Sequence, residues 1–368
     1  MRISDGMTIG RKLEIDKYRP SGFDFLRIIL AAMVLIDHSW TIAEGEQAGA
    51  DFWNQAWAFP LRFVLPAFFS LSGFLVSGSM ERCRTLLNFL MLRGIRIYPA
   101  LAIEVILSAF IIGPWVTTLP LRQYFTNKEF LIYLLNVTGD IHYKLPGVFH
   151  GNPKPDIVNW QLWTVPWELV CYTTLAVIIV IGVKKHRWLI GPAVLIGLVA
   201  AISRNLQAHG HLVILVGNVW GFDLVLYFLV GVGFFLYRNH IPRNGLLAAL
   251  SLVIAWAAIA LVPGGQYLAL IPLVYVTMFL GTCNPVWRLP FGIADCSYGV
   301  YLYGYVIQQL IANRLPWSHK GLLNLALAFP LSVVAGMLSW HFLEKPIMNA
   351  ARPQLKRIED RWLQLLGH

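Results

Sequence analysis

The feature that most constrains this 368-residue chain is a series of apolar segments, each about as long as a membrane-spanning helix. Lipid cannot satisfy backbone hydrogen bonds, so each such segment is predicted to be α-helical. The fold class is therefore all-α, a polytopic integral membrane bundle of about ten transmembrane helices. The predicted spans are 22–41, 59–80, 96–116, 161–183, 187–203, 222–238, 245–262, 266–283, 297–314 and 321–343.

Composition excludes the main alternatives to a membrane protein. Only 13% of the residues are charged and 57% are hydrophobic, whereas soluble domains carry about 25% charged residues. The apolar content excludes intrinsic disorder, and four cysteines exclude a disulfide scaffold. A net charge of +10 would suggest nucleic acid in a soluble protein. Here we attribute it to a basic cytoplasmic face and predict no nucleic-acid partner.

The distribution of basic residues predicts the orientation. With the N-terminus placed inside, the inner segments hold 20 Lys and Arg residues and the outer segments hold 8. This asymmetry predicts that both termini are cytoplasmic. The predicted organisation is a cytoplasmic segment 1–20 without a cleavable signal peptide, a transmembrane domain 21–346 and a cytoplasmic amphipathic tail 347–368. Apolar residues at helical spacing predict that the tail lies on the bilayer surface.

Besides Asp24 at its start, three ionisable residues lie in the first span, where charge is costly and therefore points to function. They are Arg27, Asp37 and His38. Arg27 and His38 are eleven residues apart, almost three helical turns, so they share one face about 16 Å apart along the axis. They can address the two ends of an elongated ligand. Each residue taken alone has another explanation: Arg27 could pair with Asp24, and His38 could lie at the membrane interface.

Further charged candidates lie near the ends of two other spans. Arg93 and Arg96 share a helix face at the predicted inner end of the third span. Guanidinium groups offer a planar fork that suits phosphates, although anchoring at the inner surface would explain the pair as well. Glu168 lies at the outer end of the fourth span, where an acid needs a partner.

Other polar residues in the spans are readily explained by packing. Ser72 lies in a small-residue stretch that permits close helix approach, and a serine nucleophile would need an adjacent base. Tyr301 is typical of an aromatic core, and Glu104 and Asp223 could join neighbouring helices. The chain lacks Walker, Rossmann and HExxH motifs and paired cysteines. We therefore expect no metal and no tightly bound cofactor.

Several short motifs, taken in order, resemble one family. They are Arg27-x10-His38, FFSLSGFLV at 68–76, Arg93-x-x-Arg96 followed by IYPA, LWTVPWE at 162–168, SYGVYLYGY at 297–305 and LEKP at 343–346. This order resembles the membrane acyltransferase-3 family of bacterial O-acetylase-like proteins. The resemblance implies a multi-pass protein of the bacterial inner membrane. It implies transfer of acetyl from cytoplasmic acetyl-CoA, a co-substrate, to a hydroxyl of a cell-envelope or exported polysaccharide or oligosaccharide.

The resemblance also implies roles for residues. His38 would act as the catalytic base, and the CoA donor would be held by Arg27, Arg93 and Arg96. We expect Glu168, rather than its alternative Asp37, to orient the imidazole, with Asp37, Ser72 and Tyr301 as possible supporting residues. The chain departs from the family pattern in two places. Gly304 stands where a histidine is frequent, and Asp37 stands where glycine or an aromatic residue is common.

Alternative functions remain open from the sequence. A transporter or flippase for a glycan-linked or anionic solute would also need many spans and intramembrane charges, but it would consume no acyl-CoA. A non-catalytic membrane scaffold or sensor would tolerate changes at His38 and Arg93. Within the acyltransferase hypothesis, both direct transfer and a covalent acyl-enzyme are compatible with the sequence.

Overall fold

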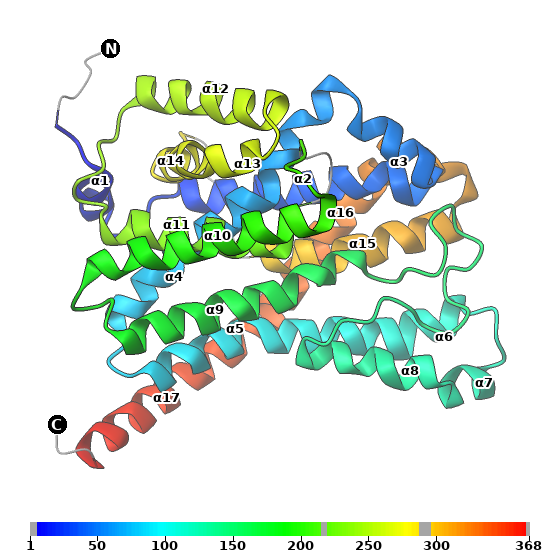
Figure 1. Cartoon of the computed structure of the whole chain (residues 1–368). Helices are drawn as coiled ribbons and strands as arrows, with labels where there is room; N and C mark the ends of the chain where they lie inside the picture. The colour runs from blue at the N-terminus through cyan, green and yellow to red at the C-terminus, as the bar shows by residue number, and fades with distance from the viewer. Residues whose placement is uncertain (1–5, 215–218, 287–295, 366–368) are drawn as a thin grey trace. The chain divides into compact units, whose positions relative to one another are not determined.

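The structure is a computed structural model that describes residues 6–214, 219–286 and 296–365 (Figure 1). In these ranges the regular structure is helical, and the only β contact is an isolated bridge between Thr8 and Pro242. The all-α prediction is therefore confirmed. The first five residues of the predicted segment 1–20 and the last three of the tail lie outside the described residues.

Each predicted span coincides with one or more helices of the structure. Six described helices are long and apolar enough to cross a membrane: Gly22–Glu44, Ala56–Arg82, Leu86–Val116, Trp160–Ile181, Arg187–His209 and Gly321–Arg361. Three shorter apolar helices are Gly221–Leu236, Gly245–Leu261 and Leu270–Gly281. The remaining predicted span is the helix Ser297–Arg314. The chain is thus a multi-pass membrane protein, and the count of ten spans and the orientation stay predictions.

The chain divides into two compact units. The first unit comprises Met1–Leu30, Arg62–Phe89 and Trp167–Arg288. Its own helices are α1 (Ile9–Ile15), α4 (Val64–Arg82), η5 (Arg187–Leu189), α10 (Ile190–His209), α11 (Gly221–Leu236), α12 (Gly245–Leu261), α13 (Gly265–Leu268) and α14 (Leu270–Gly281). Four helices continue from one unit into the other: α2 (Gly22–Glu44), η1 (Ala56–Phe63), α5 (Leu86–Leu107) and α9 (Thr164–Ile181).

Helix α11 is the centre of the first unit and packs against α4, α10 and α14. Small residues let α4 and α11 touch backbone to backbone. A Cβ on Gly73 would lie 2.1 Å from the Phe228 carbonyl oxygen, and one on Gly231 would lie 2.1 Å from that of Ser70. The small residues of the FFSLSGFLV stretch therefore serve helix packing, as predicted.

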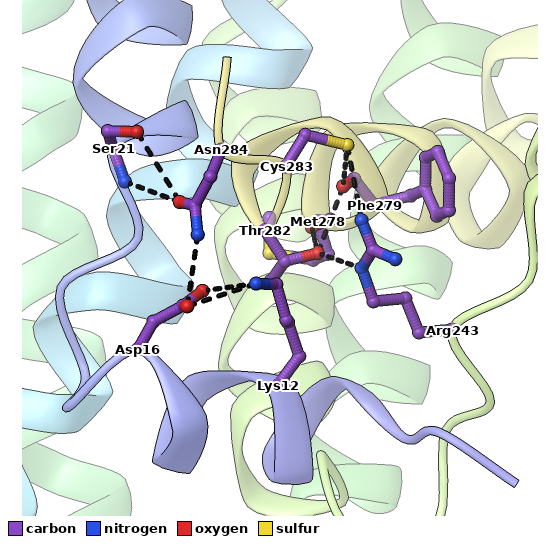
Figure 2. A network of polar contacts seen from close by, with 9 residues as sticks. All are labelled: Lys12, Asp16, Ser21, Arg243, Met278, Phe279, Thr282, Cys283 and Asn284. Atoms are coloured by element: carbon purple, nitrogen blue, oxygen red, sulfur yellow. Dashed lines mark hydrogen bonds and ion pairs between the residues drawn. The ribbon is translucent and has the colours of Figure 1, made fainter. Parts of the chain in front are cut away.

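Hydrogen bonds join the N-terminal segment to the rest of the first unit. The Arg243 N–H donates to the Met7 carbonyl at 2.8 Å. Figure 2 shows the contacts that follow: Asn284 donates to Asp16 at 3.0 Å and accepts from the Ser21 N–H at 3.1 Å. Because Ser21 precedes α2, a side chain beyond the end of α14 satisfies an N–H group at the start of α2.

The second unit comprises Ala31–Leu61, Leu90–Pro166 and Leu289–His368. Its own helices are α3 (Glu46–Trp53), η2 (Ser108–Ile112), α6 (Gly113–Val116), α7 (Leu121–Thr126), α8 (Lys128–Tyr133), η3 (Leu134–Thr138), η4 (Trp160–Trp163), α15 (Ser297–Arg314), η7 (Pro316–Ser318), α16 (Gly321–Ser339), η8 (Trp340–Glu344) and α17 (Lys345–Leu365).

Two features of the second unit position its polar residues. Helices α15 and α16, the orange part of Figure 1, pack closely, and a Cβ on Gly299 would lie 2.6 Å from the Gly336 Cα. Segments η2 and η8 are π-helical turns, a geometry frequent at functional sites. The predicted tail helix is present as α17, and its binding to the bilayer surface stays a prediction.

Candidate active site

Helix α2 carries three of the predicted site residues. Arg27, Asp37 and His38 lie on this one unbroken helix, as the sequence predicts. The boundary between the units falls after Leu30, so Arg27 belongs to the first unit and the other two to the second. Apolar residues on both sides of the acid and the histidine keep the segment helical within the predicted membrane.

The His38 ring is held by packing rather than by hydrogen bonds. It meets the Tyr305 ring of α15 edge to face, with centroids 5.1 Å apart and planes at 73°. Its side chain is 18% exposed, and Nδ1 lies 3.9 Å from the Asp37 carboxylate, too far for a hydrogen bond. Among the described residues no hydrogen bond to the ring is found. Both ring nitrogens are therefore available for proton transfer.

Helices α2 and α15 are joined on either side of His38. The Gln308 amide donates to the Leu35 carbonyl at 2.9 Å and to the Ser39 hydroxyl at 2.8 Å. A Cβ on Gly304 would lie 2.6 Å from Leu35 Cδ1. The absence of the family's frequent histidine at position 304 now has a physical reason. The space of that side chain is filled by Leu35.

A buried polar cluster, here called the Glu104 cluster, lies against the middle of α15. It comprises Glu104, Ser108, Asn159 and Gln161, all at most 1% exposed. Glu104 accepts from Ser108 at 2.8 Å and from Asn159 at 2.6 Å. Glu104 therefore connects α5 to the chain segment that precedes η4. Asn159 and Gln161 both donate to the Leu302 carbonyl, at 3.1 and 3.0 Å.

Tyr301 borders this cluster. Its hydroxyl donates to the Gln161 carbonyl at 2.8 Å and lies 2.6 Å from the Thr164 hydroxyl. Tyr301 thus fastens the start of α9 to α15. These contacts show that Tyr301 holds two helices together. A direct role for Tyr301 in acyl transfer stays a prediction.

Of the two arginines on α5, Arg96 has a defined environment. Its Nη1 donates to the Glu344 carboxylate at 3.0 Å, and the Glu344 side chain is only 2% exposed. The guanidinium also lies over the rings of Tyr298 and Trp340, at 5.5 and 5.4 Å from their centroids, a favourable cation–π arrangement. Arg93 lies one turn earlier on α5 and is half-buried.

Glu344 is itself part of a chain of hydrogen bonds. It accepts from the Ser339 hydroxyl at 3.1 Å, and Ser339 accepts from the Tyr303 hydroxyl at 3.2 Å. Glu344 is the last residue of the π-helical turn η8, which follows α16 directly. A buried carboxylate with a cation and a hydroxyl beside it is adequately paired.

The remaining predicted residues lie in the first unit. Glu168 accepts a short hydrogen bond from the Tyr172 hydroxyl one turn further along α9. Ser72 is half-buried on α4, and in the described part of the chain its hydroxyl has no hydrogen-bond partner. His38 belongs to the other unit, so its orientation by Glu168 stays a prediction.

Sequence reasoning missed some of these residues. The sequence motifs assign no role to Glu344, although it belongs to LEKP, and they do not point to Asn159, Gln161 or Gln308. A signal existed for Glu344 and Gln308, because a charge directly after an apolar run and an amide within one both need a partner. Asn159 precedes the predicted span 161–183 and Gln161 is its first residue, so neither lies within or directly after an apolar run.

These observations define the class of protein: a multi-pass helical membrane protein with a packed imidazole and a paired arginine within its helices. The comparison with known families gives the particular assignment. The profile described as "Acyltransferase domain" matches residues 21–350. The chain therefore belongs to the acyltransferase-3 family, and it is an acyltransferase of O-acetyltransferase type.

Two relatives extend over nearly the whole chain. The "O-acetyl transferase" of Shigella phage Sf6 is 26% identical over 363 residues, 92% of this chain and 99% of the relative. "Nodulation protein 10" of Rhizobium leguminosarum bv. viciae is 27% identical over 356 residues, 89% of this chain and 93% of the relative. No solved structure matches the chain significantly.

Proposed function

We propose that this protein transfers acetyl from cytoplasmic acetyl-CoA to a hydroxyl of a cell-envelope or exported glycan, in the inner membrane of a bacterium. The observation that carries the proposal is the His38 ring, which is held by Tyr305 and has no hydrogen bond from the described residues. The name of the phage Sf6 relative, "O-acetyl transferase", supports acetyl as the group transferred. The glycan acceptor follows from the family resemblance.

The reaction needs one proton acceptor that later returns the proton. His38 takes the proton of the acceptor hydroxyl while the hydroxyl oxygen attacks the thioester carbonyl carbon. The carbon–sulfur bond then breaks, and the imidazolium gives its proton to the departing sulfur. The products are an acetyl ester and CoA with a free thiol, so no net proton is released. An imidazole suits both steps because its unprotonated ring nitrogen accepts a proton and can give it back.

The donor's phosphates are bound by arginines in this proposal, namely Arg27, Arg93 and Arg96. Glu344 engages Nη1 of Arg96, and a guanidinium has five N–H donors, so donors remain for a phosphate. The pairing with Glu344 fixes the direction in which Arg96 presents them. Glu168 or Asp37 would orient His38, since a carboxylate beside an imidazole stabilises its protonated form.

The test is the O-acetyl content of envelope and exported glycans in a deletion strain. The strain is complemented with the wild type, His38→Ala, or the control His186→Ala, whose histidine is exposed and outside the site. We expect the wild type and the control to restore a specific O-acetyl signal and His38→Ala to restore none at equal membrane expression. Full restoration by His38→Ala would refute the assigned role of His38.

The same experiment separates the enzyme from the transporter hypothesis. If no glycan fraction loses O-acetyl groups on deletion, acetylation of glycans is not the function. Uptake or export of glycan-linked solutes would then be the next assay.

A further inference from the structure

An exposed apolar surface lies on a segment that belongs to none of the predicted spans. This segment, 121–138, is here called the return segment. It comprises α7, α8 and η3 and follows the long helix Leu86–Val116. Four of its apolar side chains are between 38% and 59% exposed, namely Leu121, Phe125, Leu131 and Leu135. An apolar surface of this kind marks a contact with a partner or with a membrane.

The return segment lies beside the end of the long helix rather than beyond it (Figure 1). The Tyr124 hydroxyl donates to the Ala109 carbonyl at 2.7 Å. The Phe130 ring meets the Phe110 ring edge to face, with centroids 5.3 Å apart. Both contacts are made before the helix ends at Val116, so the chain turns back along the helix that it has just left.

The length of the long helix places these contacts within the bilayer. Its 31 residues correspond to about 46 Å, close to the roughly 40–45 Å of a bilayer with its headgroups. Ala109 precedes Val116 by seven residues, which is about 10 Å along the axis. Each headgroup layer is about 5–8 Å deep. The return segment therefore lies at the outer edge of the hydrocarbon layer in the predicted orientation.

The exposed surface of the return segment continues a surface that already faces lipid. Phe110, Ile111 and Trp115 at the end of the long helix are between 48% and 60% exposed, and in a membrane helix such side chains meet lipid chains. Phe125 stacks on Phe110, with centroids 6.3 Å apart and planes at 29°. Because both rings are partly exposed, one apolar surface extends from the long helix onto the return segment.

The return segment is amphipathic in the way of a helix that lies flat in the membrane interface. Its exposed apolar residues form pairs four positions apart, at 121 and 125 and at 131 and 135, and this spacing puts each pair on one face. Exposed charged residues stand beside these pairs, namely Arg122, Lys128 and Glu129. Long basic side chains can reach the headgroups while the apolar face lies in the hydrocarbon.

The buried side of the return segment holds the irregular outer loop 139–159. Asn136 is fully buried, and its amide donates to the His142 carbonyl at 2.9 Å and accepts from the His142 N–H. At the other end of the loop, Asn159 donates to Glu104 at 2.6 Å. Irregular backbone at membrane depth has to be covered by protein, and the return segment provides such cover next to the long helix.

We propose that the return segment is a lipid-binding element of the outer leaflet. Phe125, Leu131 and Leu135 contact lipid chains, and the buried side of the segment keeps lipid away from loop 139–159. The occupant of the exposed face is the bilayer itself. The proposal concerns the surface alone and does not depend on the reaction assigned above.

The first test measures what surrounds single positions of the full-length protein in liposomes of phosphatidylethanolamine and phosphatidylglycerol. The four native cysteines are replaced, and nitroxide labels are attached to Leu131→Cys or Leu135→Cys. The controls are Gln123→Cys and Glu129→Cys, which are also exposed. At 131 and 135 we expect more frequent collisions with dissolved oxygen than with a water-soluble nickel chelate, and the reverse order at 123 and 129. Nickel collisions as frequent at 131 as at 129 would overturn the proposal.

The same labels test a second copy of the chain as the occupant. Contact between two copies at this face would broaden the spectra at 131 and 135 through spin–spin interaction. Dilution with unlabelled protein would remove that broadening. We expect spectra that do not change on dilution, and a dilution-dependent broadening would replace lipid by a second copy as the partner.

A second measurement uses the unaltered chain, so it does not depend on the cysteine variants. The protein is reconstituted with a phospholipid that carries a photoreactive diazirine in its acyl chain, and adducts are mapped by mass spectrometry. We expect adducts in 121–138 and none in 139–159. Helix α12 is the positive control, because Leu250 and Val253 are exposed on it. Adducts on α12 without any in 121–138 would refute the inference.

Discussion

Arg96 is the residue whose environment most changes how its function can be tested. Its guanidinium lies over two aromatic rings and is paired with Glu344, which is almost fully buried. Loss of activity in an Arg96 variant could thus arise from lost donor binding or from a buried carboxylate left without its cation. A variant of the pair separates the two effects.

We predict that Arg96→Ala lowers the stability of the folded protein by about 3–5 kcal/mol, because it leaves Glu344 buried and unpaired. The double variant Arg96→Met/Glu344→Leu should recover most of that stability, since apolar side chains replace both charges. It should not recover donor binding. The measurements are thermal unfolding in detergent and the KM for acetyl-CoA, with exposed Arg122→Ala as the control.

Recovery of both stability and a normal acetyl-CoA KM in the double variant would show that Arg96 is only structural. The sequence predicts Arg96 as a site residue from its charge and spacing, but it could not predict the partner of Arg96. Glu344 is 248 positions away, and a separation of that size is set by the tertiary fold rather than by a local pattern.

Among the elements, the contact between α2 and α15 determines where His38 lies. Gly304 lets Leu35 fill the space beside α15, and Gln308 fixes the neighbouring turn of α2. The apolar lengths predicted the helices well, because a span must satisfy its own backbone in lipid. They could not predict the π-helical turns or the loop contacts of Asn159, which depend on packing between distant segments.

We predict that Gly304→His destabilises the protein by at least about 1–3 kcal/mol, because the new side chain overfills a packed contact. It should also lower acetyl transfer by displacing α2 at the level of His38. Adding Leu35→Ala removes the obstructing side chain, so the double variant should regain part of the stability and part of the acetyl transfer. Thermal unfolding and O-acetyl content measure the effect, and equal losses in the single and double variants would contradict it.

For the whole molecule, the decisive property is which side of the membrane each polar segment faces. The excess of basic residues in the predicted inner segments predicts the orientation. The predicted assignment of loop 139–159 to the outside and of α17 to the cytoplasm follows from this charge asymmetry. The proposed division into a donor side and an acceptor side depends on it too.

We predict that a cysteine at Gln47 in α3 reacts with a membrane-impermeant maleimide in intact cells, whereas a cysteine at Gln354 in α17 reacts only after permeabilisation. Both positions are exposed, and the four native cysteines are first replaced. Labelling with the opposite pattern would invert the orientation. Labelling of both in intact cells would mean an even number of spans between them.

The π-helical turn η8 has a consequence for how the sequence can change. A π-helical turn holds one residue more than an α-helical turn, so it accommodates one extra residue without rotating the helix that follows. Four α-helical residues turn the chain by about 400°, and five residues in the wider π-helical turn cover nearly the same angle. Deleting one residue before Glu344 would therefore restore a regular helix and leave Glu344 facing Arg96. The ion pair thus tolerates a length change of one residue in this turn.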